Sequence, residues 1–398
     1  MAGAAVQRTG KMSDHLFEGE EEGERARAGI GSAVGVLPSQ RVIALIRRRM
    51  IRAADDIDPA QVQPASLDLR LGKTAYRVRA SFLPGAGRTV RDQLDDLALD
   101  EISLERGAVL ERGCVYVVEL QESLDLPESV SALANPKSST GRLDVFTRLI
   151  TDRSEIFDSV AAAYSGPLYA EISPRTFSVR VRKGSRLNQV RFRRRNSSQA
   201  DYADFRLSDR ELAEIHARTP LMDGEPTIRH GLHLRINLRP VGKSRLIGYR
   251  AQRYAGIVDV DQVGKCQVGE FWDKISARPD GRLILDPDEF YILASKEALH
   301  IPPDLAAEMV PIDTMMGEFR VHYAGFFDPG FGHGPAGGAG ARAVLEVRSH
   351  EVPFILEDGQ IIGRLAYERL TEPPDQLYGE IAGSNYQAQG LKLSKHFR

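Results

Sequence analysis

The sequence contains an internal duplication, which limits the possible folds more than any other feature. Residues 110–136 (LERGCVYVVELQESLDLPESVSALANP) resemble residues 285–311 (LDPDEFYILASKEALHIPPDLAAEMVP). Each segment has an apolar strand, then a polar turn, then Leu-Pro or Ile-Pro. Three pairs of residues are separated by the same 175 positions: Pro127 and Pro302, Pro136 and Pro311, and Glu171 and Glu346. The chain is therefore expected to contain two copies of one structural unit.

The order of elements recurs as well. Residues 37–48 and 207–218 both have the pattern of a short amphipathic helix, with Ser39 and Ser208 as N-caps. A strand of alternating apolar and polar residues follows each helix. These two strands are expected near 66–72 and 232–238.

The remaining strands are short, rich in Val, Ile, Leu and Tyr, and bounded by Gly, Pro and Asp. This pattern predicts a mainly β fold, with two tandem β-barrel or jelly-roll-like repeats and a few short helices. We expect the repeats to span 37–200 and 201–398, joined by a polar linker at 192–202. Residues 1–36, rich in Glu, Gly and Ala, are expected to form a flexible N-terminal extension.

The composition narrows the function. With 53 Lys and Arg against 55 Asp and Glu, the formal charge is −2, which disfavours a general nucleic-acid binder. No apolar stretch approaches the ~20 residues that cross a bilayer. The first residues lack the apolar core of a secretion signal. Cys114 and Cys266 are the only cysteines, so neither a disulfide framework nor a cysteine-rich zinc site is expected. A cytoplasmic protein fits these features.

Residues 135–142 (NPKSSTGR) combine hydroxyls, a lysine, a glycine and an arginine. These groups suit a polyphosphate, and the segment is expected to open a short helix. It is not a Walker loop. A simple N-capped turn is the alternative interpretation of this segment.

Glu346 interrupts an apolar strand, AVLEV. A carboxylate there is either satisfied by a partner or functional, because burying it alone is costly. Desolvation would raise its pKa, which suits proton transfer near neutral pH. Upstream, an Asp-Pro-Gly turn is expected to present Asp328 at a strand end.

Residues 383–395 (GSNYQAQGLKLSK) suit a flap over a nucleotide, with a frayed tail as the alternative. The sequence lacks the H-x-E and P-C-x-x-C motifs of zinc deaminases, and it has no H-E-x-x-H. Any hydrolysis is therefore expected to use a water activated by a carboxylate, without a protein-bound metal.

In these segments the chain resembles the dCTP deaminase family, which shares its fold with trimeric dUTPases. It is most similar to the long, internally duplicated bacterial form. The matching stretches are PKSSTGRLDVF, AGFFDPGFG, AVLEV, EDGQIIGRLAYERL and NYQAQG, in the order that the family shows. The likeness covers roughly residues 37–398.

The resemblance implies a role for each matching residue. Lys137, Ser138, Ser139 and Arg142 would hold the triphosphate and order the reaction centre. Asp328 would contact the deoxyribose, and Ala324 and Val344 would offer backbone groups to the base. Glu346 would move protons, with Arg142 and Ser138 as its catalytic partners. Tyr378 and Gln389 would close over the nucleotide. Asn385 stands where the family usually has a lysine.

The two repeats depart from the family pattern in complementary ways. Repeat 2 has PIDTMMG (311–317) where the serines and arginine of the phosphate motif belong. Repeat 1 keeps that motif but has TDRSEIFDSV (151–160) in place of the Asp-Pro-Gly stretch, and it has no flap. One composite site per chain is expected, with Glu171 a relic or a structural partner.

The predicted function is metal-independent deamination of dCTP to dUTP and ammonia. Mg²⁺ would accompany the triphosphate, and no cofactor would be bound by the protein. Alternatives are a dUTP diphosphatase, a bifunctional deaminase and diphosphatase, or a non-catalytic nucleotide-binding regulator. The tyrosine of the dUTPase motif is missing, with Phe331 nearby. The sequence leaves open the oligomeric state, including a homo-oligomer, and feedback by dTTP.

Overall fold

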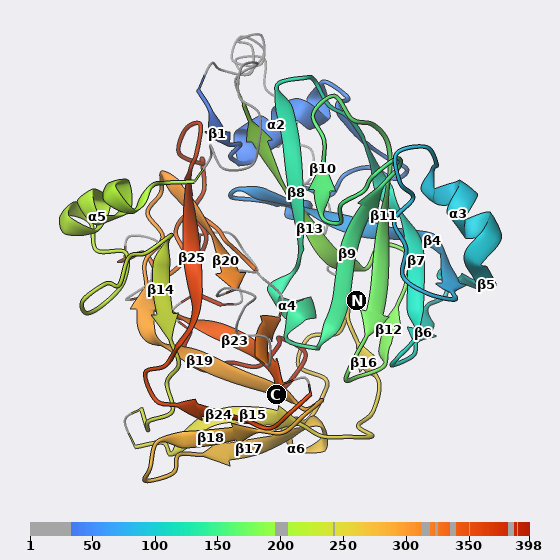
Figure 1. Cartoon of the computed structure of the whole chain (residues 1–398). Helices are drawn as coiled ribbons and strands as arrows, with labels where there is room; N and C mark the ends of the chain where they lie inside the picture. The colour runs from blue at the N-terminus through green and yellow to red at the C-terminus, as the bar shows by residue number, and fades with distance from the viewer. Residues whose placement is uncertain are drawn as a thin grey trace, which may run out of the picture.

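The computed structural model describes residues 33–195, 206–241, 243–311, 319–322, 325–334, 340–349, 351–380, 386–387 and 389–398. Strands dominate, and helices are short, so the predicted fold class is confirmed. Figure 1 shows the first repeat, coloured blue to green, beside the second, coloured yellow to red. No helix in the described part of the chain is both long enough and apolar enough to span a membrane.

The first repeat is built on one large antiparallel sheet (Figure 1). Its main strands follow the order β10 (Ser159–Val160), β8 (Val130–Pro136), β13 (Arg186–Arg194), β4 (Ser66–Val78), β7 (Val115–Asp125), β11 (Ser165–Pro174) and β9 (Val145–Thr151). Four shorter strands pair beside this path: β1 (Gly35–Val36), β2 (Ile51–Ala53), β3 (Val62–Gln63) and β5 (Ala98–Ser103).

The second repeat has two principal sheets and a separate pair of antiparallel strands. The first sheet runs β14 (Leu232–Arg235), β25 (Ile361–Arg369), β20 (Leu305–Pro311) and β22 (Phe326–Phe327). The second runs β17 (Trp272–Ser276), β15 (Leu246–Ala251), β19 (Phe290–Leu299), β23 (Ala341–Ser349) and β21 (Phe319–His322). The separate pair is β18 (Arg282–Leu285) with β24 (Phe354–Glu357).

A small sheet joins the repeats. β16 (Val258–Asp259) of the second repeat pairs in parallel with β12 (Val179–Val181) of the first, and β12 also pairs with β6 (Ala108–Leu110). The ring of Trp272 meets Phe177 edge to face, with their centroids 5.4 Å apart. The same cluster holds Phe397, whose ring is 5.7 Å from Trp272. The last residues of the chain are therefore packed between the repeats.

The short helices are α2 (Ser39–Arg47), α3 (Val90–Leu97), α4 (Ser138–Gly141), α5 (Asp209–Arg218), α6 (Val268–Phe271) and a 3₁₀ turn at Pro59–Gln61. Ser208 caps α5 through the amide of Glu211, as predicted. The prediction of Ser39 as a cap is wrong, because Ser39 is already helical and Pro38 is the capping position. Proline has no side-chain acceptor, so α2 begins without a side-chain cap.

Equivalent strands of the two repeats end at equivalent positions. β8 and β20 end at Pro136 and Pro311, and β13 and β25 end at Arg194 and Arg369. β13 ends inside the segment 192–202 that was expected to be a linker, and it pairs with β8 up to and including Arg194. Two residues of the expected extension, Gly35 and Val36, also pair with β13.

Candidate active site

A cavity of about 640 Å³ lies between the two repeats. Its lining includes nine of the residues expected in the site. Seven of them, from both repeats, are Lys137, Ser138, Ser139, Arg142, Asp328, Val344 and Glu346. Tyr378 and Gln389 line it as well. The structure therefore brings these predicted residues together within one chain. Ala324 and Asn385 lie outside the described residues.

Arg142 is the C-cap of α4, the short helix that follows β8. Its guanidinium donates from Nη2 to the side-chain oxygen of Gln389, and from Nη1 to the carbonyl of Lys392, both at 3.1 Å. The ring of Tyr386 lies 4.0 Å from the guanidinium carbon. The C-terminal segment of the second repeat therefore fixes the arginine of the first.

Glu346 projects from the middle of β23 and is buried, with 6% of its surface exposed. Its Oε1 lies 3.8 Å from Nε of Arg142. Burial is the main cause that raises the pKa of Glu346 to about 8. The charge of Arg142 opposes this shift, and the negative charge of Asp144 adds to it. This confirms the expected direction, and it gives a carboxyl group able to exchange a proton near neutral pH.

Asp328 follows β22 and sits against a buried arginine that sequence reasoning missed. Nη2 of Arg191, on β13 of the first repeat, donates to Oδ1 of Asp328 at 3.1 Å. Desolvation raises the pKa of Asp328, while Arg191 acts in the opposite direction.

The turn that follows Asp328 depends on a glycine. At Gly330, with φ of +94°, a Cβ would lie 2.9 Å from the amide nitrogen of Tyr378. Only glycine permits that close approach.

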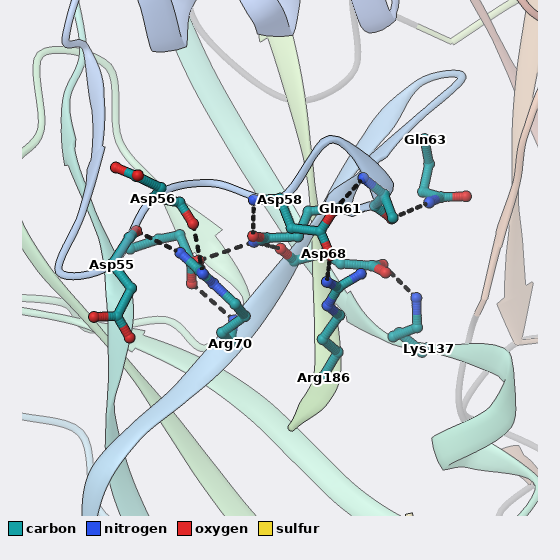
Figure 2. Close-up of polar contacts among 11 residues, drawn as sticks. Asp55, Asp56, Asp58, Gln61, Gln63, Asp68, Arg70, Lys137 and Arg186 are labelled. Carbon is teal, nitrogen blue, oxygen red and sulfur yellow. Dashed lines mark hydrogen bonds and ion pairs between the residues drawn. The ribbon is translucent and has the colours of Figure 1, made fainter. Parts of the chain in front are cut away.

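Lys137, Arg186 and Lys395 also line the cavity and add positive charge to its wall. Lys137 forms an ion pair with Asp68, and Arg186 forms one with Asp58 at 2.5 Å. Figure 2 shows Lys137 pointing toward Asp68 and Arg186 toward Asp58. Lysine and arginine side chains can bind phosphate oxygens, and here two of the three are paired with carboxylates.

Asp68, Arg186 and Arg191 are residues of the site that did not emerge from the sequence. Tyr386 and Lys395 belong to the segment 383–395 that was expected to form the flap. Asp68 did offer a signal, because its carboxylate stands between two leucines in the strand expected near 66–72. Arg186 and Arg191 offered none, since they stand among several other basic residues in the stretch 186–195 and basic residues are common on protein surfaces. Within the described residues, no group of three or more His, Cys, Asp or Glu side chains is arranged to hold a metal ion.

The fold and the cavity together define a duplicated β protein in which a cavity between the repeats brings a buried carboxyl group together with cationic side chains. The model of the 2'-deoxycytidine 5'-triphosphate deaminase N-terminal domain matches residues 33–196, and that of the C-terminal domain matches residues 208–397. The chain belongs to this family of dCTP deaminases.

Solved and curated relatives agree with this assignment. The crystal structure of the 2'-deoxycytidine 5'-triphosphate deaminase from Agrobacterium tumefaciens is 55% identical, with a TM-score of 0.80. The match covers 85% of this chain and 99% of that one. A dUMP-forming dCTP deaminase of Halobacterium salinarum is 28% identical over 42% of this chain and 85% of its own length. A dUMP-forming dCTP deaminase of Streptomyces coelicolor is 36% identical over 30% of this chain and 60% of its own length.

Proposed function

We propose that the protein deaminates dCTP hydrolytically, giving dUTP and ammonia. The observation that carries this proposal is the buried Glu346, with a pKa raised to about 8, held 3.8 Å from Arg142 in a cavity between the repeats. A carboxyl group of this kind can both accept and return a proton near neutral pH. Membership of the family supports dCTP as the substrate.

In the proposed reaction, ionised Glu346 takes a proton from a water molecule whose oxygen attacks C4 of cytosine. Glu346 then delivers that proton to N3. A second transfer, from the new hydroxyl to the departing amine, breaks the C4–N bond and releases ammonia. A carbonyl remains at C4, so the base becomes uracil. Arg142 and Ser138 position the water and stabilise the charge that develops.

The rest of the nucleotide would fit the remaining wall. Asp328, steadied by Arg191, is the proposed partner of the deoxyribose. The backbones of Ala324 and Val344 would face the base. Lys137, Ser138, Ser139 and Arg142 would bind the triphosphate, to which Arg186 and Lys395 add positive charge. Tyr378, Asn385 and Gln389 would close over the bound nucleotide.

Mg²⁺ would enter with the triphosphate as part of the substrate. Asp68 and Asp261 line the cavity together with the cationic residues, and carboxylate oxygens are the ligands that Mg²⁺ prefers. No cofactor bound by the protein is part of the proposal.

A second candidate function is conversion of dCTP to dUMP, with release of both ammonia and pyrophosphate. The names of the relatives from Halobacterium salinarum and Streptomyces coelicolor favour it, and so do the two carboxylates among the cationic residues. A non-catalytic regulator is disfavoured, because binding alone does not require a buried carboxyl with a raised pKa.

One assay separates these candidates. Purified protein is incubated with dCTP and, separately, with dUTP, each with Mg²⁺, while ammonia and pyrophosphate are measured. We expect ammonia from dCTP without pyrophosphate. Equal amounts of ammonia and pyrophosphate would establish the dUMP-forming reaction instead. Pyrophosphate from dUTP alone would indicate a diphosphatase, and neither product from either nucleotide would refute an enzymatic function.

A further inference from the structure

A second cavity, of about 230 Å³, lies at the junction of the repeats. Its residues come from five separate stretches of the chain, and four of them are arginines: Arg112, Arg175, Arg253 and Arg348. Asp288 and Glu289 are the acidic residues of its lining. The cavity shares none of its lining residues with the active-site cavity.

The arginines of this cavity differ in what binds them. Arg253 is paired with Glu289 at 2.6 Å, and Arg348 is paired with Asp144 and donates to the hydroxyl of Thr176 at 3.0 Å. Within the described part of the chain, by contrast, the guanidinium groups of Arg112 and Arg175 have no hydrogen bond or ion pair. The guanidinium groups of these two arginines are therefore available to bind an anion at the cavity.

Tyr254 forms the rim and has an unusual conformation. It is a non-glycine residue with φ of +61°, and 92% of its surface is exposed. A bulky residue in this backbone region is strained, and such strain is concentrated at functional sites. An exposed ring beside arginines offers a face for stacking and a hydroxyl for hydrogen bonding.

We propose that this cavity is a second anion site, which binds a phosphate or pyrophosphate group, either free or as the phosphate end of a nucleotide. Arginine forks fit phosphate oxygens in pairs, and the lining of this cavity contains two guanidinium groups without an ion pair among the described residues. At about 230 Å³, against about 640 Å³ for the active-site cavity, the space suits the phosphates alone. A nucleoside would extend outward toward Tyr254.

The anion site borders the catalytic pair. Glu346 and Arg348 lie two residues apart on β23 and so share a face of the strand. Arg142 and Asp144 are also two residues apart, and they pair with Glu346 and Arg348, respectively. An anion that binds Arg348 competes with Asp144, and so loosens the segment that carries Arg142. Occupancy of the anion site should therefore lower kcat.

The test uses the fluorescence of Trp272, the only tryptophan, whose ring is 6.0 Å from that of Phe290 in the cavity wall. The full-length protein is titrated with pyrophosphate. We expect a saturable signal that weakens roughly tenfold or more in the double variant Arg112→Ser/Arg175→Ser. Arg79→Ser/Arg106→Ser is the matched control, since both arginines are exposed and line neither cavity. The control should bind as the wild type does.

Pyrophosphate can also occupy the phosphate end of the active site, so only the binding lost in Arg112→Ser/Arg175→Ser is attributed to the anion site. That component should persist in Arg186→Ser, which alters the active-site cavity alone. Unchanged binding in Arg112→Ser/Arg175→Ser, or no saturable binding by the wild type, would overturn the proposal. These outcomes do not depend on whether dCTP is deaminated.

A parallel titration with dATP in Tyr254→Ala identifies the source of the phosphate. Weaker binding of dATP with unchanged binding of pyrophosphate would identify a nucleotide that stacks on Tyr254. Unchanged binding of both would identify a free anion. With dCTP as substrate, pyrophosphate should lower kcat of the wild type but not of Arg112→Ser/Arg175→Ser, whereas competition at the active site changes only KM.

Discussion

Glu171 and Glu346 occupy equivalent positions in the two repeats, on β11 and β23, and both are buried. Their partners differ. Oε1 of Glu171 accepts from Nη2 of Arg148 at 2.5 Å and from Nε at 3.1 Å. The arginine opposite Glu346 stays 3.8 Å away, and within the described residues its Nε makes no hydrogen bond. The same strand position therefore holds a closed ion pair in one repeat and an open one in the other.

The space around the two glutamates differs as well. The guanidinium of Arg148 is 4.7 Å from the ring of Phe146 and 3.5 Å from that of Phe157, so aromatic side chains cover the pair in repeat 1. Glu346 lines the 640 Å³ cavity, and Glu171 does not. A duplicated fold can thus keep one carboxylate for structure and leave its counterpart for chemistry.

The largest expected effect separates these two glutamates by activity. Glu346→Gln keeps the size of the side chain but cannot accept a proton, so deamination of dCTP should fall by about 10²–10⁴-fold. Binding of dCTP should persist. The matched variant Glu171→Gln should change kcat less than about threefold, because Glu171 does not line the cavity.

Ammonia release and dCTP binding are measured for both variants side by side. Substantial deamination by Glu346→Gln would remove this residue from the mechanism. A comparable loss in Glu171→Gln would show that the contrast between the repeats is wrong.

The sequence alone identified those residues of the site that stand out within their own short segments. The lone acid in AVLEV and the cluster in PKSSTGR identified Glu346 and Arg142, because each breaks its own segment's pattern. Helix α3 was missed, although Thr89 and Asp92 form a capping box at its start. Arg191 was missed as a partner of Asp328, which lies 137 positions away. Such pairings depend on how the repeats pack, and no local pattern encodes them.

The second expected effect concerns Arg142, whose counterpart in repeat 2 falls in the segment 311–317 that has lost the phosphate motif. Arg142→Ala removes charge-assisted contacts at the reaction centre and should lower kcat by about 10²–10³-fold. Because Arg142 and Glu346 lie 3.8 Å apart in one chain, a mixture of Arg142→Ala and Glu346→Gln should stay inactive after subunit exchange.

The mixture is assayed for ammonia after mild dissociation and reassociation, with wild-type protein treated in the same way as the control. Recovery of activity would mean that the working pair of residues comes from two different chains.

A smaller effect should appear in the pH dependence. If Glu346 must be ionised to accept a proton from water, kcat/KM should fall by about tenfold for each pH unit below its pKa of about 8, and level off above it. Glu171→Gln should leave this profile unchanged. A profile that is flat between pH 6 and pH 8, at rates limited by chemistry, would contradict the assignment of Glu346 as the base.

The smallest expected effect is on stability, and it should have opposite signs for the two glutamates. The pKa of Glu346 is about 8 in the folded protein, against an ordinary value of 4.5. Between these values the folded state keeps a proton that the unfolded state has lost, so this residue lowers stability as the pH rises. Glu346→Gln removes that cost and should stabilise the protein by about 1–3 kcal/mol at pH 7. The gain should vanish below about pH 4.5.

Glu171→Gln should instead destabilise the protein by about 1–3 kcal/mol, because Arg148 would lose its carboxylate partner in a mostly buried setting. Thermal unfolding of both variants at pH 5, 6, 7 and 8 measures the two effects. The difference in stability between Glu346→Gln and the wild type should increase with pH, because only the wild type carries a carboxyl group at this position that ionises on unfolding. A loss of stability in Glu346→Gln at pH 7 would mean that this carboxyl group is a satisfied structural residue, as Glu171 is, and the contrast between the repeats would no longer hold.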